Sequence, residues 1–398
     1  RMLLTRTDKE TLMQLVDGDA PGESGSNRII ENFSFFTEQI AKADLGDVWK
    51  GIKKLMIVDV CLQPGIDNPQ MIFESMNSTG KALTQADLIR NFVLMGLKHE
   101  LQTRLYTDYW RPMELEFGAD NYISAFDEFM RFYLVVHTGN VRIRRGDVYD
   151  EFKAYSRKYE VETLLGSLKE FARYFCRIAL NTEKDKILAE AFHDIRELRA
   201  DVCYPMLMEL YHDFQQELIC RDDFLTILRM VEAYVFRRSV CDIPTNSLRQ
   251  TFATFMRQVN KDRYVESLKA GFLLLPSYRR FPGDNEFIRH IQIRNLYKFN
   301  RRSYWLRRFE NHGRKERVPV LDYTIEHIMP QNEDLSASWR SDLGNDWKRI
   351  HEQFLHLLGN LTLTGYNSEY SDRPFAEKRD MAGGFKESPL KLNKGIGA

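Results

Sequence analysis

A histidine, a carboxylate, two asparagines and a lysine lie within one short stretch near the end of the chain. The stretch opens with Asp-Tyr-Thr-Ile-Glu-His-Ile-Met-Pro-Gln-Asn at 322–332, continues with Leu-Gly-Asn-Leu-Thr-Leu-Thr-Gly-Tyr-Asn at 358–367 and closes with Pro-Phe-Ala-Glu-Lys at 374–378. Hydrolysis of a phosphodiester needs a base for water, a cation for the developing charge and stabilisation of the leaving oxygen. These residue types could supply such chemistry.

Each side chain suits one task. His327 suits the general base, since the reference pKa of imidazole is about 6.5. Glu326 and Asn367 offer the oxygen ligands that a hard divalent ion such as Mg²⁺ or Mn²⁺ prefers. Asn360 would fix the loop or orient His327, and Lys378 would touch a phosphate. Each residue taken alone has a structural alternative, because asparagine after glycine or tyrosine is usually a turn residue. Their combination in one segment favours the chemical interpretation.

Local propensity predicts the order strand, loop, strand, helix for this stretch. Residues 323–325 have strand propensity, and Pro330 forces a loop. Residues 361–364 form the second predicted strand, and a helix is predicted over 371–380 with Pro374 near its first turn. This order can bring a histidine and an asparagine from separate elements to one metal ion.

A basic, aromatic stretch precedes the chemical one. Residues 289–317 hold ten lysines or arginines against two glutamates, with tyrosine, phenylalanine and tryptophan interleaved. Such a stretch is a place for phosphate contacts, and the alternative is a cationic helix face whose aromatics lie in the core. The candidate DNA contacts are Arg301, Arg302, Arg307 and Arg308.

Upstream residues predict a largely helical protein. Amphipathic patterns indicate helices over 29–43, 122–136, 148–159, 162–179, 186–198, 205–214 and 222–237, whereas the apolar run 55–62 suits a buried strand. Thr84 followed by Asp87 forms a capping box, so a helix is predicted to begin at residue 85. The turn before it, with its backbone amides, is a candidate phosphate holder. Its candidate nucleotide-binding residues are Asn77, Gly80, Asp87 and Arg90, and capping, turning and solvation are their structural alternatives.

Composition narrows the class of protein. A chain of 398 residues predicts two or three domains. Its 57 basic and 57 acidic side chains give no net charge, so nucleic acid would have to bind a local patch.

Five widely spaced cysteines without a Cys-x-x-Cys pair argue against a disulfide framework or a zinc site and favour a reducing cytosol. No apolar run is long enough to span a membrane. Because the first residue is arginine, the chain is expected to begin inside a longer protein.

The motifs resemble a known nuclease family. Glu-His-Ile-Met-Pro-Gln, Leu-Gly-Asn-Leu-Thr-Leu, the later Asn367 and Phe375-x-x-Lys378 are similar to the His-Asn-His (HNH, ββα-metal) domain at the C-terminus of GmrSD-type restriction proteins. The resemblance implies His327 as general base, Asn367 as metal ligand and Asn360 as a supporting residue. Glu326 replaces the aspartate of a related domain's motif. No histidine follows residue 371, and His356 is a further candidate participant.

Residues 71–92 resemble the end of the ParB/sulfiredoxin-like domain of the same family. That domain binds and hydrolyses nucleoside triphosphate, but its Asp-Gly-Gln-Gln-Arg signature does not occur in this chain. Triphosphate use is therefore expected only together with a part upstream of Arg1.

Together these observations predict a mainly α protein with a small ββα-metal domain. The expected domains are a ParB-like remnant at 1–97, a helical middle at 98–310 and an HNH nuclease at 311–398. The expected function is a cytoplasmic, Mg²⁺- or Mn²⁺-dependent endonuclease of modification-dependent restriction, acting on modified phage DNA. The alternatives are a nucleotide-regulated DNA-binding or scaffold protein with an inactive nuclease fold, and an RNA nuclease. Whether the protein forms a homodimer is left open.

Overall fold

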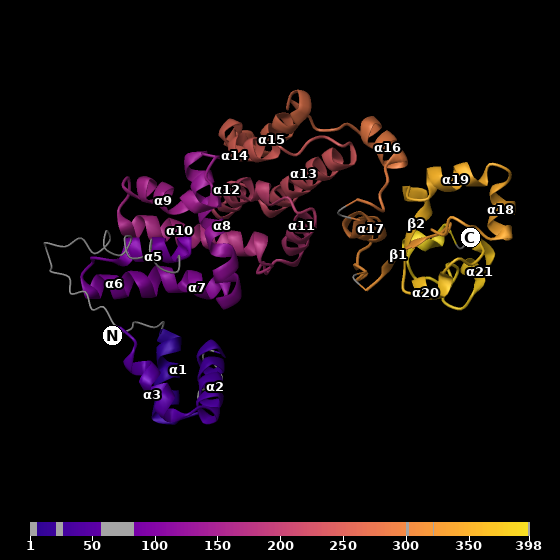
Figure 1. Cartoon of the computed structure of the whole chain (residues 1–398). Helices are drawn as coiled ribbons and strands as arrows, with labels where there is room; N and C mark the ends of the chain where they lie inside the picture. Colours follow the sequence, from indigo (N-terminus) through magenta and orange to yellow (C-terminus); the bar gives the residue numbers. More distant parts are fainter. Residues whose placement is uncertain (1–5, 21–26, 57–82, 300–301, 321, 397–398) are drawn as a thin grey trace. The chain divides into compact units, whose positions relative to one another are not determined.

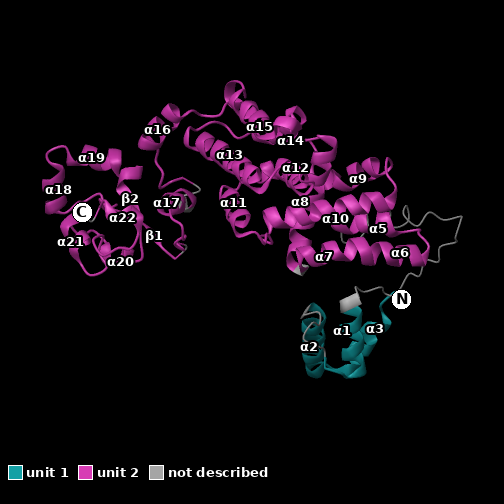
Figure 2. Cartoon of the chain, turned by 180° about the vertical axis from the view of Figure 1, so that it is seen from behind, with its two compact units in different colours: residues 1–68 teal, residues 69–398 magenta. Residues whose placement is uncertain are grey.

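The computed structural model describes residues 6–20, 27–56, 83–299, 302–320 and 322–396. Contacts within the chain divide it into two compact units, residues 1–68 and 69–398 (Figure 2). Helices dominate both units, in agreement with the predicted mainly α class (Figure 1). None of the described helices is long and apolar enough to cross a membrane.

The described residues of the first unit form the helices α1 (Arg6–Asp17), α2 (Asn27–Lys42) and α3 (Leu45–Lys53). Helix α3 begins at Asp44, whose carboxylate accepts hydrogen bonds from the backbone amides of Gly46 and Asp47. The predicted helix over 29–43 is confirmed by α2. The predicted strand over 55–62 falls mostly outside the described residues.

The helical part of the second unit confirms the predicted helices to within a few residues. Its helices are α5 (Gln85–Leu94), α6 (His99–Leu105), α7 (Arg111–Phe117), α8 (Ala119–Thr138), α9 (Val148–Ser156), α10 (Val161–Ala179), α11 (Lys186–Glu197), α12 (Tyr204–Gln215), α13 (Arg221–Val240), α14 (Leu248–Phe255), α15 (Tyr264–Leu273), α16 (Asp284–Ile293) and α17 (Arg302–Asn311). A π-helical turn at Tyr106–Trp110 joins α6 to α7.

The core of this part is built on the aromatic stripe of α8. Phe126, Phe129 and Tyr133 recur at helical spacing and are completely buried. Phe129 packs against Phe117 of α7 and Phe175 of α10, with ring centroids 5.8 Å and 5.7 Å away. Each buried aromatic ring contributes about 1.5–3 kcal/mol of hydrophobic free energy, so core packing explains the stripe.

Helix α5 packs with the helical part of the second unit. Its N-cap is Thr84, whose hydroxyl accepts a hydrogen bond from the Asp87 amide at 3.1 Å, as the capping box predicted. Ala86 and Ile89 lie in the same core as α8. The compact units divide at 68/69, and the domain boundary expected at 97/98 stays a prediction.

The C-terminal region carries a two-stranded antiparallel sheet. Strand β1 (Thr324–His327) pairs with β2 (Leu361–Thr364), and His327 lies opposite Leu361. The helices around the sheet are α18 (Ala337–Leu343), α19 (Trp347–Phe354), α20 (Asn367–Tyr370), α21 (Phe375–Asp380) and α22 (Lys391–Lys394), drawn toward yellow in Figure 1.

The end of this region differs from the single helix predicted over 371–380. Two short helices, α20 and α21, stand in its place. Ser371 between them has a φ of 41°, a left-handed conformation that cannot continue an α-helix. Pro374 stands directly before the first turn of α21. Proline lacks an amide hydrogen, and at the start of a helix this costs no hydrogen bond within the helix.

Candidate active site

Two histidine rings meet at the end of β1. His327 is the last residue of the strand and is 3% exposed. His356 follows α19, and its Nδ1 lies 3.0 Å from Nε2 of His327. The sheet thus brings the predicted base together with the histidine that sequence analysis named as a further participant.

The surroundings of His327 keep its ring neutral. Burial, followed by the neighbouring His356, Lys378 and His351, lowers the pKa of His327 to about 4. Burial also lowers the pKa of His356, with Lys298 acting in the same direction. Two neutral rings at hydrogen-bonding distance share one proton. When Nε2 of His327 donates it, Nδ1 of the same ring carries the lone pair that a general base needs.

A tyrosine from outside the predicted nuclease domain covers both histidines. The ring of Tyr297 lies 4.4 Å from that of His327, edge to face, and 5.2 Å from that of His356, stacked at 11°. The amide of Leu296 donates to the carbonyl of His356 at 3.0 Å. The site therefore depends on residues upstream of the predicted boundary at 311.

Glu326 and Lys378 form a buried ion pair under the sheet. Lys378 is completely buried, and its Nζ lies 2.7 Å from Oε1 of Glu326. The same Nζ donates to the carbonyls of His327 and Ile328 at 3.1 and 3.2 Å, so its three protons are all used. Burial raises the pKa of Glu326, and Lys378 opposes that rise. The predicted phosphate contact of Lys378 does not fit this geometry, because the ammonium is enclosed and fully paired.

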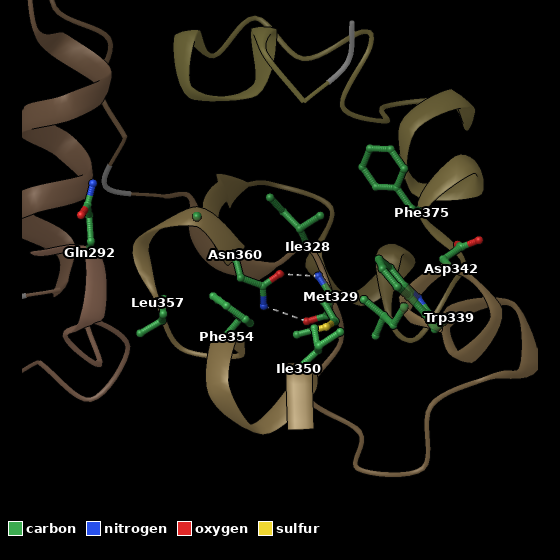
Figure 3. Close-up of a pocket in the computed structure, with 12 residues that line it drawn as sticks. Gln292, Ile328, Met329, Trp339, Asp342, Ile350, Phe354, Leu357, Asn360 and Phe375 are labelled. Carbon is green, nitrogen blue, oxygen red and sulfur yellow. Dashed lines mark hydrogen bonds between the residues drawn. The ribbon is translucent and has the colours of Figure 1, made fainter. Parts of the chain in front are cut away.

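Asn360 fixes the loop that follows β1. Its Oδ1 accepts from the Met329 amide at 2.6 Å, and its Nδ2 donates to the Met329 carbonyl at 3.0 Å (Figure 3). The same Nδ2 donates to the Leu355 carbonyl at 2.8 Å. His351 adds a second anchor, since its Nε2 donates to the Pro330 carbonyl at 2.8 Å. Of the two roles expected for Asn360, the structure shows the loop-fixing one.

Asn367 is one of the two predicted metal ligands. Its Nδ2 donates to Oγ1 of Thr324 and to the carbonyl of Ile325, at 3.1 and 2.9 Å, so its Oδ1 is the atom that could bind a hard cation. The other predicted ligand, Glu326, is buried, and Lys378 pairs with its Oε1 and offsets its charge. Both ligand roles stay predictions.

The C-terminal region has a family match. Residues 281–398 match the model of the GmrSD restriction endonucleases, C-terminal domain. Residues 281–398 are therefore similar to that domain, and we call them the GmrSD domain. The match begins before α16 and so includes Tyr297, which the boundary predicted at 311 left out. No curated protein sequence matches the chain. The ParB-like resemblance of residues 71–92 stays a prediction.

The GmrSD domain also contains a large apolar cavity. Its volume is about 670 Å³, and Trp339, Ile350, Phe354 and Phe375 line it (Figure 3). Its wall includes Met329, in the loop that Asn360 holds. The lining is mainly hydrophobic and does not include His327, so this cavity is not where a phosphodiester would meet the base.

Two of the four arginines predicted to contact DNA have other partners. Arg307 is 7% exposed and pairs with Asp194 at 2.7 Å and with Glu197, both near α11. Arg308 pairs with Glu232 at 2.9 Å. These contacts tie α17 of the GmrSD domain to α11 and α13, which differs from the expected DNA contact. Arg301 and the side chain of Arg302 lie outside the described residues.

Arg307→Ala is expected to lower the free energy of unfolding by about 2–3 kcal/mol, because it removes charge-assisted hydrogen bonds inside the fold. The loss is limited because Arg229 still pairs with Asp194 at 2.5 Å. Urea denaturation measures the change. The exposed Arg289→Ala, in the same basic stretch, is the control and should change stability by less than about 0.5 kcal/mol. An unchanged urea midpoint for Arg307→Ala would contradict the structural role.

The candidate nucleotide residues that are described serve the helix. Arg90 pairs with Asp87 at 3.0 Å and with Glu114 at 3.2 Å. Asp87 also accepts a hydrogen bond from the Thr84 hydroxyl. Asn77 and Gly80 lie outside the described residues. Asp87 and Arg90 are thus engaged in local ion pairs, which is the structural alternative considered for them.

Sequence reasoning underestimated the histidines of the GmrSD domain. Three of the nine histidines in the chain, at 327, 351 and 356, fall within one short segment. The structure gives all three a place around the loop or the strand end. That clustering was the available signal. Tyr297 had no such signal, since it resembled the other aromatics of the basic stretch.

Proposed function

We propose that this protein is a metal-dependent DNA endonuclease of a phage-defence system, with His327 as the base that activates water. The carrying observation is the buried His327 ring at the end of β1, whose Nε2 lies 3.0 Å from Nδ1 of His356. The restriction endonuclease family of residues 281–398 supports DNA as the substrate class.

The proposed step needs one proton acceptor and one attacking oxygen. Nδ1 of His327 accepts a proton from water while the water oxygen forms a bond to phosphorus. The bond from phosphorus to the leaving oxygen breaks, and that oxygen takes a proton from solvent. Asn367 would hold a divalent ion, Mg²⁺ or Mn²⁺, which supplies stabilisation of the charge on the phosphate. His356 keeps His327 in the tautomer that can accept the proton.

Cleavage assays test the proposal and its substrate. Supercoiled plasmid, modified phage DNA, unmodified phage DNA and a matched RNA are each incubated with Mg²⁺ or Mn²⁺, with and without nucleoside triphosphate. Nicking of DNA that depends on the metal supports the endonuclease. Preference for modified phage DNA supports modification-dependent restriction, and a stimulating triphosphate supports the ParB-like expectation. Cleavage of RNA alone would overturn the DNA assignment.

A second candidate function has one observation in its favour. Glu326, which its residue type suggested as a metal ligand, is paired with Lys378. A nuclease fold without that ligand would suit a nucleotide-regulated DNA-binding or scaffold protein. Titration of Mg²⁺ and Mn²⁺ against plasmid nicking separates the two functions. DNA binding without nicking at any metal concentration would favour the second candidate.

His356→Ala is expected to slow cleavage by about 10–100-fold, the usual cost of removing a partner that orients a functional histidine. Since His356 helps to lower the pKa of His327, its removal should also raise the pH at which activity falls off in acid. In the native protein that fall should occur well below the ordinary pKa of histidine, toward pH 4.

Single-turnover rates measured across pH check this prediction. His356→Gln is the matched variant, because its side-chain oxygen can still accept a proton from Nε2 of His327. It should recover part of the rate that His356→Ala loses. A purely structural role for His356 would lower the rate without moving the acid limb, and that outcome would contradict the positioning role.

A further inference from the structure

A cysteine, a glutamate and a histidine converge where α13 ends against α16. Cys241 caps the C-terminus of α13 and is 7% exposed. Glu286 and His290 are four residues apart on α16 and therefore lie on one face of that helix. One ligand atom from each residue lies within 4.8 Å of the other two. Among the described residues this is the one such group of three metal-ligating side chains.

The two helices that carry these residues are packed together. The rings of Phe236 on α13 and Phe287 on α16 meet edge to face at 5.8 Å. Arg237 of α13 pairs with Asp284 of α16 at 2.6 Å. These contacts set the register of α16 on α13 without help from an ion. The cluster is therefore preorganised, which lowers the entropic cost of binding.

We propose that Cys241, Glu286 and His290 bind a single divalent cation of the zinc type, at a site separate from the nuclease centre. Thiolate, imidazole and carboxylate together are a ligand set for zinc, whereas Mg²⁺ prefers oxygen ligands alone. Zinc bonds of about 2.0–2.3 Å place tetrahedral ligands roughly 3.3–3.8 Å apart, so the side chains must close by about 1 Å. Arg280 holds Oε1 of Glu286 at 2.5 Å, so the movement would come from rotamer adjustment of the half-buried His290 and from Oε2 of Glu286.

A fourth ligand is close by. Asp242 follows Cys241 directly, and its side chain is 79% exposed. Asp242 and His290 line the same cavity, which places the two side chains near each other. Arg294 holds Oδ1 of Asp242 at 3.0 Å, so Oδ2 or a water molecule would complete a tetrahedron.

The electrostatic surroundings favour a cation only once the thiol has lost its proton. The C-terminal end of α13, a helix of 20 residues, carries partial negative charge beside Cys241. Burial raises the pKa of the Cys241 thiol and Glu286 adds to this, while Arg280, Arg237 and Arg294 oppose it. Binding therefore releases the thiol proton to solvent, and affinity should increase with pH.

This site would join the GmrSD domain to the helical part that precedes it. Glu286 and His290 lie inside the matched range 281–398, and Cys241 lies outside it. Sequence analysis argued against a zinc site because no two cysteines are closely spaced. A site with one cysteine has no Cys-x-x-Cys signature, and its other ligands become adjacent only when α16 packs on α13.

Cobalt binding to the whole chain tests the proposal. The protein, reduced and freed of metal with a chelator, is titrated with Co²⁺, whose bond to a thiolate gives an intense near-ultraviolet absorption band. We expect about one equivalent of Co²⁺ to bind with this band, and Zn²⁺ to displace it. Cys241→Ser and His290→Ala should lose the band, whereas Cys220→Ser, at an exposed cysteine, should keep it.

Two further measurements distinguish loss of the metal site from loss of the fold. Far-ultraviolet circular dichroism shows whether each variant is folded, and Glu286→Gln, half-buried on α16, should stay folded while weakening Co²⁺ at least tenfold. Absence of the thiolate band in the folded native protein overturns the proposal, as does an unchanged band in Cys241→Ser.

Discussion

His327→Ala is expected to reduce nicking of supercoiled plasmid by about 10²–10⁴-fold, the typical contribution of a general base. Nδ1 of His327 is the proposed proton acceptor, and the low pKa of about 4 keeps it unprotonated at neutral pH. Histidines 351 and 356 do not replace it, because one holds the Pro330 carbonyl and the other holds His327 itself. The effect should therefore fall on the chemical step.

The measurement is the single-turnover nicking rate at saturating Mg²⁺ or Mn²⁺, together with DNA binding by the same variant. Binding should stay within a few-fold of the native value while the rate falls. His327→Asn is the matched variant, since its amide can still bond to His356 but cannot act as a base. The exposed His99→Ala is the control and should leave the rate unchanged. Undiminished cleavage by folded His327→Asn would remove His327 from the mechanism.

Lys378→Met is expected to lower the free energy of unfolding by about 3–5 kcal/mol, because it leaves Glu326 buried without its partner. Glu326 is 4% exposed, and burial already raises its pKa. The variant also removes the hydrogen bonds from Nζ to the carbonyls of His327 and Ile328. We expect the loop after β1 to loosen and nicking to fall with it.

A double-mutant cycle isolates the ion pair. Glu326→Gln combined with Lys378→Met removes both charges, so the double variant should be more stable than Lys378→Met alone. Urea denaturation gives the four free energies, and the exposed Lys394→Met serves as the control. Equal loss of stability in the single and the double variant would mean that the carboxylate is not an uncompensated buried charge. That result would return Glu326 to consideration as a metal ligand.

The helices were predictable because their information is local. The apolar spacing of 122–136 and 162–179 is the 3.6-residue period of one buried face, and α8 and α10 follow it closely. Thr84 could be identified as a cap from two residues. The strands at β1 and β2 followed from β-branched residues beside a proline and a glycine. A helix over 371–380 was wrong because amphipathic spacing does not report the left-handed Ser371.

The residues of the site were predictable from the sequence, but which side chains pair with one another was not. His327 and Asn360 stood out by motif, and the structure places both at the end of β1. That Lys378 meets Glu326, and that Arg307 meets Asp194, depends on contacts between residues distant in sequence. A charged side chain has the same sequence signal whether it faces a phosphate or a buried carboxylate. The two cases differ in how deeply the charged side chain is buried, and this is seen only in the folded structure.

The short β1–β2 pair has one further consequence. Four residues on each strand provide few hydrogen bonds, so the pair alone would hardly resist a slip by one residue. Such a slip would turn His327 away from His356 and Glu326 away from Lys378, since neighbouring strand residues face opposite sides. Asn367 donates a hydrogen bond to the Ile325 carbonyl near the start of β1. Asn360 accepts a hydrogen bond from the Met329 amide just beyond the end of the strand. The two asparagines therefore fix the register of β1, and this register determines whether His327 lies beside His356 and can act as a base.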